Sequence, residues 1–178
     1  MYYDVIMAGF GGQGVMLIGN LLAYAAIREG KNVTYLPSYG VEMRGGTANC
    51  SVVVSEEEIG SPVVGQPGSL IIMNRPSLMK FAPRLKSGGV LILNSSLVSV
   101  TECPRDDLDL VPLPLNDLAR EVGNDKLANM VALGALVAKT GVVALETVKA
   151  ALEDALNPKY HQMIPLNQQA MEKGAVLV

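Results

Sequence analysis

One stretch near the beginning of the chain, VIMAGFGGQGVM at residues 5–16, decides the fold. Its apolar first part is typical of a buried strand, four glycines follow, and an apolar-periodic segment at 15–27 predicts a helix. Gly9, Gly11 and Gly14 match G-x-G-x-x-G between a strand and a helix, a pattern that permits a sharp turn and close approach of a ligand to the backbone. The turn should therefore present unpaired N–H groups at a helix N-terminus, which favour an anion.

The glycine turn also has two other interpretations. A nicotinamide-binding fold would place Asp or Glu about 20 residues further on, at the end of the second strand, to hold the ribose hydroxyls. That strand is predicted at 32–36, and no acidic residue follows it until Glu42. Dinucleotide redox chemistry is therefore disfavoured, whereas glycines that serve only a tight strand-to-helix joint remain an open alternative.

Composition predicts a single domain over residues 1–178 with a substantial core. Hydrophobic residues make up 49% and charged residues 17%, so we expect part of the surface to be covered by other subunits, and the isolated chain to self-associate. The net charge of −3 provides no basic field for nucleic acid. No apolar run approaches the roughly 20 residues that cross a bilayer, so we expect no membrane span and a cytoplasmic location.

The cysteine and histidine content argues against metal chemistry on this chain. Cys50 and Cys103 are far apart and cannot supply the four thiolates of an iron–sulfur cluster, and His161 is the only histidine. Cys50 lies in a strand pattern and is expected to be a small core residue. His161 is interpreted as a surface or capping residue, since no Ser–His–acid set can be assembled around it.

The order of predicted elements indicates an α/β fold. The first strand at 3–8, a helix at 12–29 and the second strand at 32–36 form a βαβ unit with parallel strands. Residues 37–47 are rich in turn formers and are predicted as a loop, too short for a helical crossover, so the third strand should be antiparallel to a neighbour. Further strands are expected at 48–55, 69–73, 90–93 and, as an edge strand, 111–113. A short helix should follow 74–76 and end at about 85, and further helices are expected at 115–122, 129–140, 145–156 and 164–173. We predict a three-layer α/β/α sandwich, Rossmann-like, with a mixed central sheet.

Small polar and basic residues follow several of these strands. Ligands of open α/β sheets lie beyond the carboxyl ends of the strands, so the glycine turn, Arg44, Arg75 and the 94–96 segment could gather at one edge. Each also has a structural interpretation: Ser95 and Ser96 could cap a turn, and Arg75 could pair with a surface carboxylate.

Two further features leave their roles open. Glu42 and Arg44 could form an ion pair with another chain or be solvated in their loop. Asn129, at the start of a predicted helix, could be its N-cap.

Four motifs together resemble the γ subunits of 2-oxoacid:ferredoxin oxidoreductases. They are GFGGQGV at 9–15, SYGVEMRGG at 38–46, NSS at 94–96 and NMVALG at 129–134, in the same order and over nearly the whole chain. The second motif is the most specific, and the overall run is most similar to the 2-oxoglutarate enzymes, although pyruvate, branched-chain and indolepyruvate relatives share the signatures.

The resemblance implies a subunit of a larger enzyme. Such enzymes use thiamine diphosphate and coenzyme A to convert a 2-oxoacid into acyl-CoA and CO2, and pass electrons through iron–sulfur clusters to ferredoxin. This chain lacks a G-D-G motif followed by N-N and a cysteine set, so thiamine diphosphate, magnesium and the clusters are expected on partner α, β and ferredoxin-like δ subunits, and the chain alone should be inactive.

For the chain itself we predict two groups of site residues, with no catalytic residue and no metal ligand. One group closes over the thiamine site and helps bind coenzyme A; it comprises Gly9, Gly11, Gly12, Gln13, Gly14, Asn94 and Ser95. The other forms a subunit-contact loop near the active site; it comprises Ser38, Tyr39, Glu42, Arg44, Gly45 and Gly46.

Overall fold

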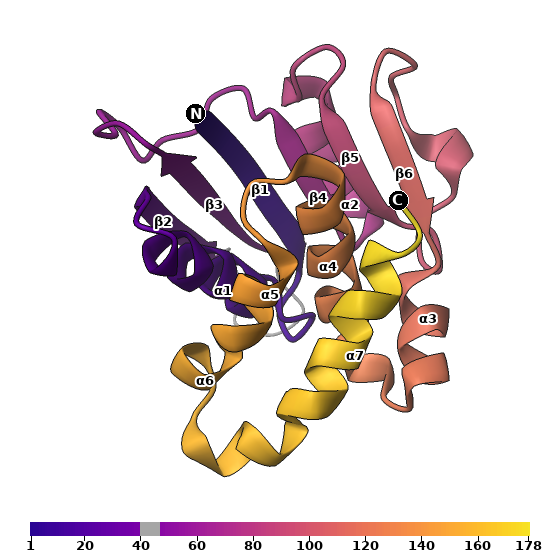
Figure 1. The fold of residues 1–178 in the computed structure, drawn as a ribbon. Coiled ribbons are helices and arrows are strands. Elements are labelled where there is room, and N and C mark those ends of the chain that lie inside the picture. The colour runs from indigo at the N-terminus through magenta and orange to yellow at the C-terminus, as the bar shows by residue number, and fades with distance from the viewer. Residues whose placement is uncertain (40–46) are drawn as a thin grey trace.

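The computed structural model describes residues 1–39 and 47–178 and contains a six-stranded sheet in the order β2-β3-β1-β4-β5-β6 (Figure 1). The strands are β1 (Tyr2–Phe10), β2 (Asn32–Tyr39), β3 (Thr47–Ser55), β4 (Ser69–Ile72), β5 (Val90–Asn94) and β6 (Asp109–Leu113). Strand β3 is antiparallel to both of its neighbours, β1 and β2, while β1, β4, β5 and β6 are parallel. The predicted mixed sheet is confirmed, as is the edge position of the proline-containing last strand.

Strand β2 corrects the predicted loop. Ser38 and Tyr39 belong to this strand, where they pair with Asn49 and Ala48 of β3. The turn-forming residues obscured the strand, but β2 is an edge strand, where Pro37 is tolerated because one side of the strand needs no sheet partner. The predicted loop residues Glu42, Arg44, Gly45 and Gly46 lie outside the described residues.

The helices agree closely with the apolar periodicity, except that the first helix starts later than predicted and the predicted helix at 145–156 is divided at Ala151 into two helices. They are α1 (Val15–Arg28), α2 (Arg75–Phe81), α3 (Leu115–Val122), α4 (Ala128–Thr140), α5 (Leu145–Ala150), α6 (Leu152–Ala155) and α7 (Ile164–Ala175). Helix α1 begins at Val15 and not at Gly12, because Gly14 adopts left-handed angles, φ 74° and ψ 20°, at the N-cap. The connection into α4 is a short 3-10 turn, η3 (Asp125–Leu127).

Hydrophobic side chains form a core on each face of the sheet. One core joins α1, α3, α4 and α7 to alternate residues of the strands, and the smaller one joins α2 to the opposite face. Figure 1 shows α4, α5 and α7 stacked in front of the sheet. The fold is therefore an α/β/α arrangement in which the turns after β1, β4, β5 and β6 open at one edge.

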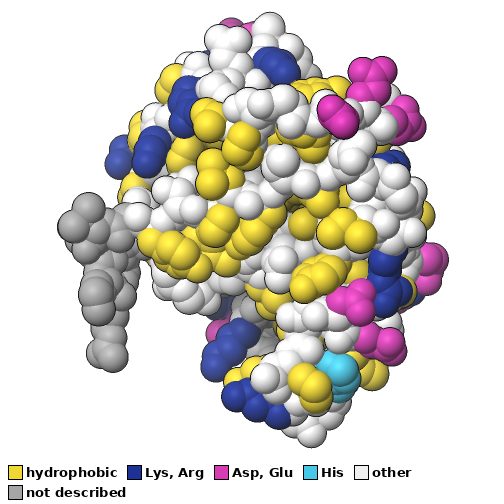
Figure 2. Space-filling model, turned by 90° about the vertical axis from the view of Figure 1, so that its left-hand side faces the viewer, with side chains coloured by type: hydrophobic (Ala, Val, Ile, Leu, Met, Phe, Trp, Pro, Cys, Tyr) yellow, Lys and Arg dark blue, Asp and Glu magenta, His cyan; other side chains and the backbone are white. Residues whose placement is uncertain are grey.

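The side of the molecule that carries β2 is unusually apolar. Figure 2 shows a band of hydrophobic side chains across the middle of this face, with charged groups mainly at its borders. Leu36 and Tyr39 of β2 and Ile27 of α1 are exposed. Within the described part of the chain, no helix is long and apolar enough to cross a membrane.

Candidate functional site

The glycine turn between β1 and α1 has a backbone that other residues adopt only with strain. Gly12 and Gly14 have φ angles of 95° and 74°, in the left-handed region that glycine enters without steric cost. A Cβ at Gly12 would meet open space, whereas a Cβ at Gly14 would lie 2.3 Å from the Asn129 Nδ2 atom. The turn thus needs glycine at both positions, at Gly12 for conformation and at Gly14 for conformation and space.

Gln13 fixes this turn to the end of the neighbouring strand. Its Oε1 accepts a hydrogen bond from the Phe10 N–H at 2.7 Å, and its Nε2 donates to the Met73 carbonyl at 3.3 Å. Gly9 makes room for the arrangement, because a Cβ there would lie 2.5 Å from Gln13 Oε1. Gln13 and Gly9 therefore hold the turn in place.

Asn129 is not the N-cap of its helix. It is the second residue of α4, is 4% exposed, and its Nδ2 donates to the Gly14 carbonyl at 3.2 Å. Its Oδ1 accepts from the Met130 N–H at 2.9 Å. The helix begins by continuing η3, so its first turn has no need of a side-chain cap, and the Asn129 amide is available for the glycine turn.

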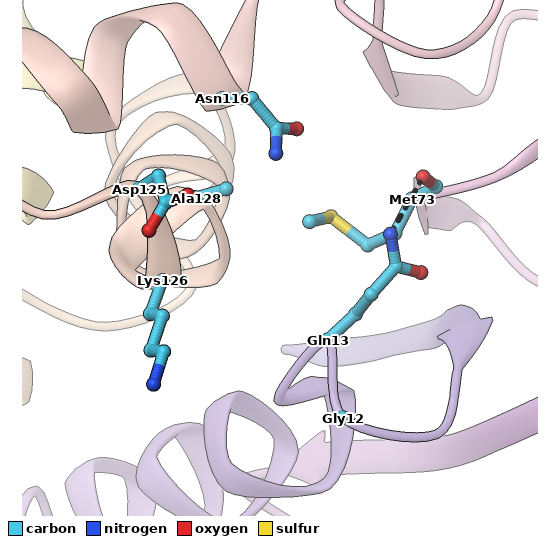
Figure 3. Close-up of a pocket in the computed structure, with 7 residues that line it drawn as sticks. All are labelled: Gly12, Gln13, Met73, Asn116, Asp125, Lys126 and Ala128. Carbon is cyan, nitrogen blue, oxygen red and sulfur yellow. Dashed lines mark hydrogen bonds between the residues drawn. The ribbon is translucent and has the colours of Figure 1, made fainter. Parts of the chain in front are cut away.

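A cavity of about 200 Å³ lies against this turn. The turn, the end of β4 and the starts of α3 and α4 all contribute to its wall, which is formed by Gly12, Gln13, Met73, Asn116, Asp125, Lys126 and Ala128. Figure 3 shows Gln13 and Lys126 on opposite sides of the space, with Asn116 above it. Lys126 is exposed and forms no ion pair with any described residue, so it adds a free positive charge next to the helix N-terminus.

The end of β5 and the residues after it hold the cavity wall in place without lining the cavity. Asn94 is fully buried and its Nδ2 donates to Asn116 Oδ1 at 2.8 Å, which orients a side chain of the cavity wall. Ser95 pairs through its N–H with the Leu113 carbonyl. The Ser96 hydroxyl accepts from the Asn116 N–H at 3.2 Å and so satisfies a donor in the first turn of α3, whereas we expected it to cap a turn of its own segment. Neither Asn94 nor Ser95 lines the cavity itself.

The positively charged side chain at the cavity is Lys126, whereas the sequence indicated Arg44 and Arg75. Arg75 forms an ion pair with Glu102, and this pair lowers the pKa of the Glu102 carboxyl. Its structural interpretation is therefore confirmed, and Arg44 is not described. Lys126 was missed because it follows a helical segment, and Asn116 because it lies in the predicted helix at 115–122, although it comes soon after the predicted edge strand at 111–113.

The described residues offer no group of three or more His, Cys, Asp or Glu side chains placed to hold a metal ion. Cys50 is buried, and burial raises the pKa of its thiol to about 12, so it behaves as the expected core residue. What the site provides is a set of backbone donors, amides, one lysine and one carboxylate, that of Asp125. The backbone donors, the amides and the lysine can bind and orient an anion, whereas the Asp125 carboxylate would repel one that came close to it.

Comparison with known proteins identifies the family. The sequence model of the pyruvate ferredoxin/flavodoxin oxidoreductase family matches residues 4–177, and the chain belongs to this family. It is 36% identical over 173 residues to the ketoisovalerate oxidoreductase subunit VorA of Methanothermobacter marburgensis, covering 96% of this chain and 35% of that protein. It is also 35% identical to the 2-oxoglutarate synthase subunit KorC of the same organism, covering 100% of this chain and 97% of that one. The chain thus spans about a third of the VorA relative and nearly all of the KorC relative.

Solved structures agree with the family and the fold. The γ subunit of a keto/oxoacid ferredoxin oxidoreductase from Geobacter sulfurreducens superposes with a TM-score of 0.83 at 34% identity, covering 98% of this chain and 96% of that one. The 2-oxoglutarate:ferredoxin oxidoreductase from Magnetococcus marinus, solved with 2-oxoglutarate, coenzyme A and succinyl-CoA bound, gives 0.89 at 25% identity, covering 99% of this chain and 31% of that one. The predicted α/β fold and the resemblance to γ subunits are confirmed.

Proposed function

We propose that this chain is the γ part of a 2-oxoacid:ferredoxin oxidoreductase that acts on 2-oxoglutarate. The complex would convert the 2-oxoacid and coenzyme A into acyl-CoA and CO2 and reduce ferredoxin. The full-length match to KorC supports this substrate over the branched-chain substrate of VorA, of which the chain covers only a part. With two separate cysteines and no thiamine motif, the chain itself does not suit the clusters or thiamine diphosphate, so we assign them to α, β and δ partners.

Within that complex, we assign the cavity at the glycine turn to the diphosphate of coenzyme A. The observation that carries this assignment is Lys126, which lies across the cavity from the glycine turn and forms no ion pair with a described residue, although Asp125 adds a carboxylate to the same wall. Backbone N–H groups, the helix dipole and an ammonium group all stabilise a diphosphate. Because pockets for whole ligands measure roughly 300–1,000 Å³, a cavity of about 200 Å³ suits this part of coenzyme A and leaves the thiol end to a partner.

Charge reversal at Lys126 tests the assignment in the assembled complex. Lys126→Glu should raise the KM for coenzyme A about tenfold, since charge-assisted hydrogen bonds contribute roughly 1.5–3 kcal/mol, and should leave the KM for 2-oxoglutarate unchanged. The rise of the coenzyme A KM with ionic strength should also become less steep in the variant, because salt screens the lost attraction.

Lys80→Glu is the matched control. Lys80 is an exposed lysine on α2 that forms no ion pair with a described residue and does not line the cavity. It should behave as the wild-type protein does. A Lys126→Glu complex with an unaltered coenzyme A KM would contradict the assignment.

Two other functions compete with this one. A dinucleotide-dependent dehydrogenase is disfavoured because β3 lies between β1 and β2, where the Rossmann fold pairs its first two strands, and β2 carries no acidic residue. A scaffold subunit without a ligand is favoured by the apolar band around β2. We assign that band and the predicted contact loop at 38–46 to partner subunits, a role that is compatible with coenzyme A binding at the glycine turn.

A further inference from the structure

Asn129 connects two walls of the cavity without lining it. Its side chain leaves α4, the helix that carries Ala128 of the wall, and donates to the carbonyl of Gly14 at the start of α1. That carbonyl also accepts the first α-helical bond of α1, from the Ile18 N–H at 3.2 Å. Two donors from different helices therefore share one carbonyl oxygen.

This shared carbonyl determines where the adjacent N–H group points. A peptide unit is planar and trans, so its C=O and N–H bonds are directed to opposite sides. Holding the Gly14 oxygen in place therefore fixes the direction of the Val15 N–H, one of the donors at the start of α1 that lack a partner within the helix. Gln13 restrains the preceding peptide units from the β4 side, so Asn129 is the restraint from the α4 side.

We propose that Asn129 is a positioning residue that keeps the N–H groups of the glycine turn directed at the cavity. This inference rests on the proposed binding of coenzyme A at the same turn. It assigns Asn129 to binding and not to chemistry, because its side chain touches only protein groups and is 4% exposed. Loss of its donor should loosen the turn and weaken coenzyme A binding while the catalytic rate at saturation is kept.

Asn129→Leu tests the proposal, with Asn167→Leu as its control. Leucine has nearly the shape of asparagine and no donor. Asn167 is a second buried asparagine, 5% exposed, whose Nδ2 donates to the Met163 carbonyl at 2.7 Å, so the control removes a similar hydrogen bond elsewhere. Asn129→Ser, whose hydroxyl is too short to replace the amide, serves if the leucine variant does not fold.

Two measurements separate the inference from the function on which it rests. Amide hydrogen exchange of Phe10, Gln13 and Ile18, whose N–H groups are all bonded within the turn, should accelerate about fivefold in the Asn129 variants of the purified chain and stay unchanged in the control, since one hydrogen bond contributes about 1 kcal/mol. In the assembled complex the KM for coenzyme A should rise about tenfold, with kcat within about twofold.

The outcomes are distinguishable. Faster exchange with a raised coenzyme A KM supports both the inference and the proposed function. Faster exchange with an unchanged KM supports Asn129 as the restraint of the turn and overturns the assignment of coenzyme A to this turn. Unchanged exchange, or an equal effect of Asn167→Leu, overturns the role of Asn129.

Discussion

The glycine turn and the crossing of α4 with α7 both depend on glycine, for opposite physical reasons. Gly12 in the turn has a φ of 95° and open space where a Cβ would be. Gly134 of α4 and Gly174 of α7 have ordinary helical backbones. A Cβ at Gly134 would nevertheless lie 2.0 Å from the Met171 carbonyl oxygen, and a Cβ at Gly174 would lie 1.9 Å from the Val131 carbonyl oxygen. The turn needs glycine for its left-handed backbone conformation, whereas the helix crossing needs glycine because the two backbones leave no space for a Cβ.

The difference separates glycines that serve packing from glycines that serve a turn. A glycine that is required for space supports packing, because two backbones come into contact there, and it explains how α4 lies so close to α7. A glycine that is required for its φ angle, with open space around it, leaves room for a ligand at the backbone. Gly14 combines both requirements, which places it at the junction between the site and the core.

Gly134→Ala should have the largest effect on stability. The added methyl group collides with the backbone of α7, which cannot rotate away as a side chain could, so the helices must separate and the free energy of unfolding should fall by about 3 kcal/mol or more. Chemical denaturation of the purified chain measures this change. Gly65→Ala, at a loop glycine whose Cβ meets no atom within 4 Å, is the control and should have little effect. A similar small effect of Gly134→Ala would contradict the distinction between the two kinds of glycine.

In the turn, Gly14→Ala should be more destabilising than Gly12→Ala. Both variants force alanine into left-handed angles at a cost of roughly 1–2 kcal/mol, and only Gly14→Ala adds the contact with Asn129. Truncation of Asn129 to alanine should reduce the difference between the two variants, because it removes the atom that the methyl group meets. A double-mutant cycle in urea measures this coupling, and purely additive free energies would argue against it.

The sequence predicted the fold well because its signals are local. Apolar periodicity located α3 and α4, and the short connection after β2 required an antiparallel neighbour. The insertion of β3 between β1 and β2 was not predictable, because strand order depends on which strands pair and not on periodicity. Tyr39 was assigned to a loop because its strand is stabilised by hydrogen bonds to β3, which local propensity does not register.

Only part of the candidate site could be predicted from the sequence. The glycine motif indicated the turn directly, since Gly12 and Gly14 have left-handed φ angles and Gly9 makes room for Gln13. Lys126 and Asn116 come from the starts of helices, and their meeting at the turn depends on how α3 and α4 pack on the sheet. Asn94 was placed correctly at a strand end, but its amide donates to Asn116 of α3. This contact could not be predicted without knowing where α3 packs.

The smallest predicted effect concerns the titration of Cys50, whose thiol packs against Gly19 of α1, another glycine that is required for space. A Cβ at Gly19 of α1 would lie 2.4 Å from the Cys50 sulfur, so α1 seals the thiol from water, and burial raises its pKa from 9.0 to about 12. The folded state therefore keeps the proton while the unfolded chain loses it, so stability should decrease as the pH rises from 9 towards 12. Since one pKa unit corresponds to about 1.4 kcal/mol, the Cys50 contribution between pH 9 and 10 should be about 1 kcal/mol or less. Cys50→Ala should flatten the slope of unfolding free energy against pH in this range, while Tyr35, whose pKa is raised to about 12 mainly by burial, keeps its proton in the folded state of both proteins. An identical slope in the two proteins would show that water reaches Cys50, and that α1 packs on β3 less closely than α4 packs on α7.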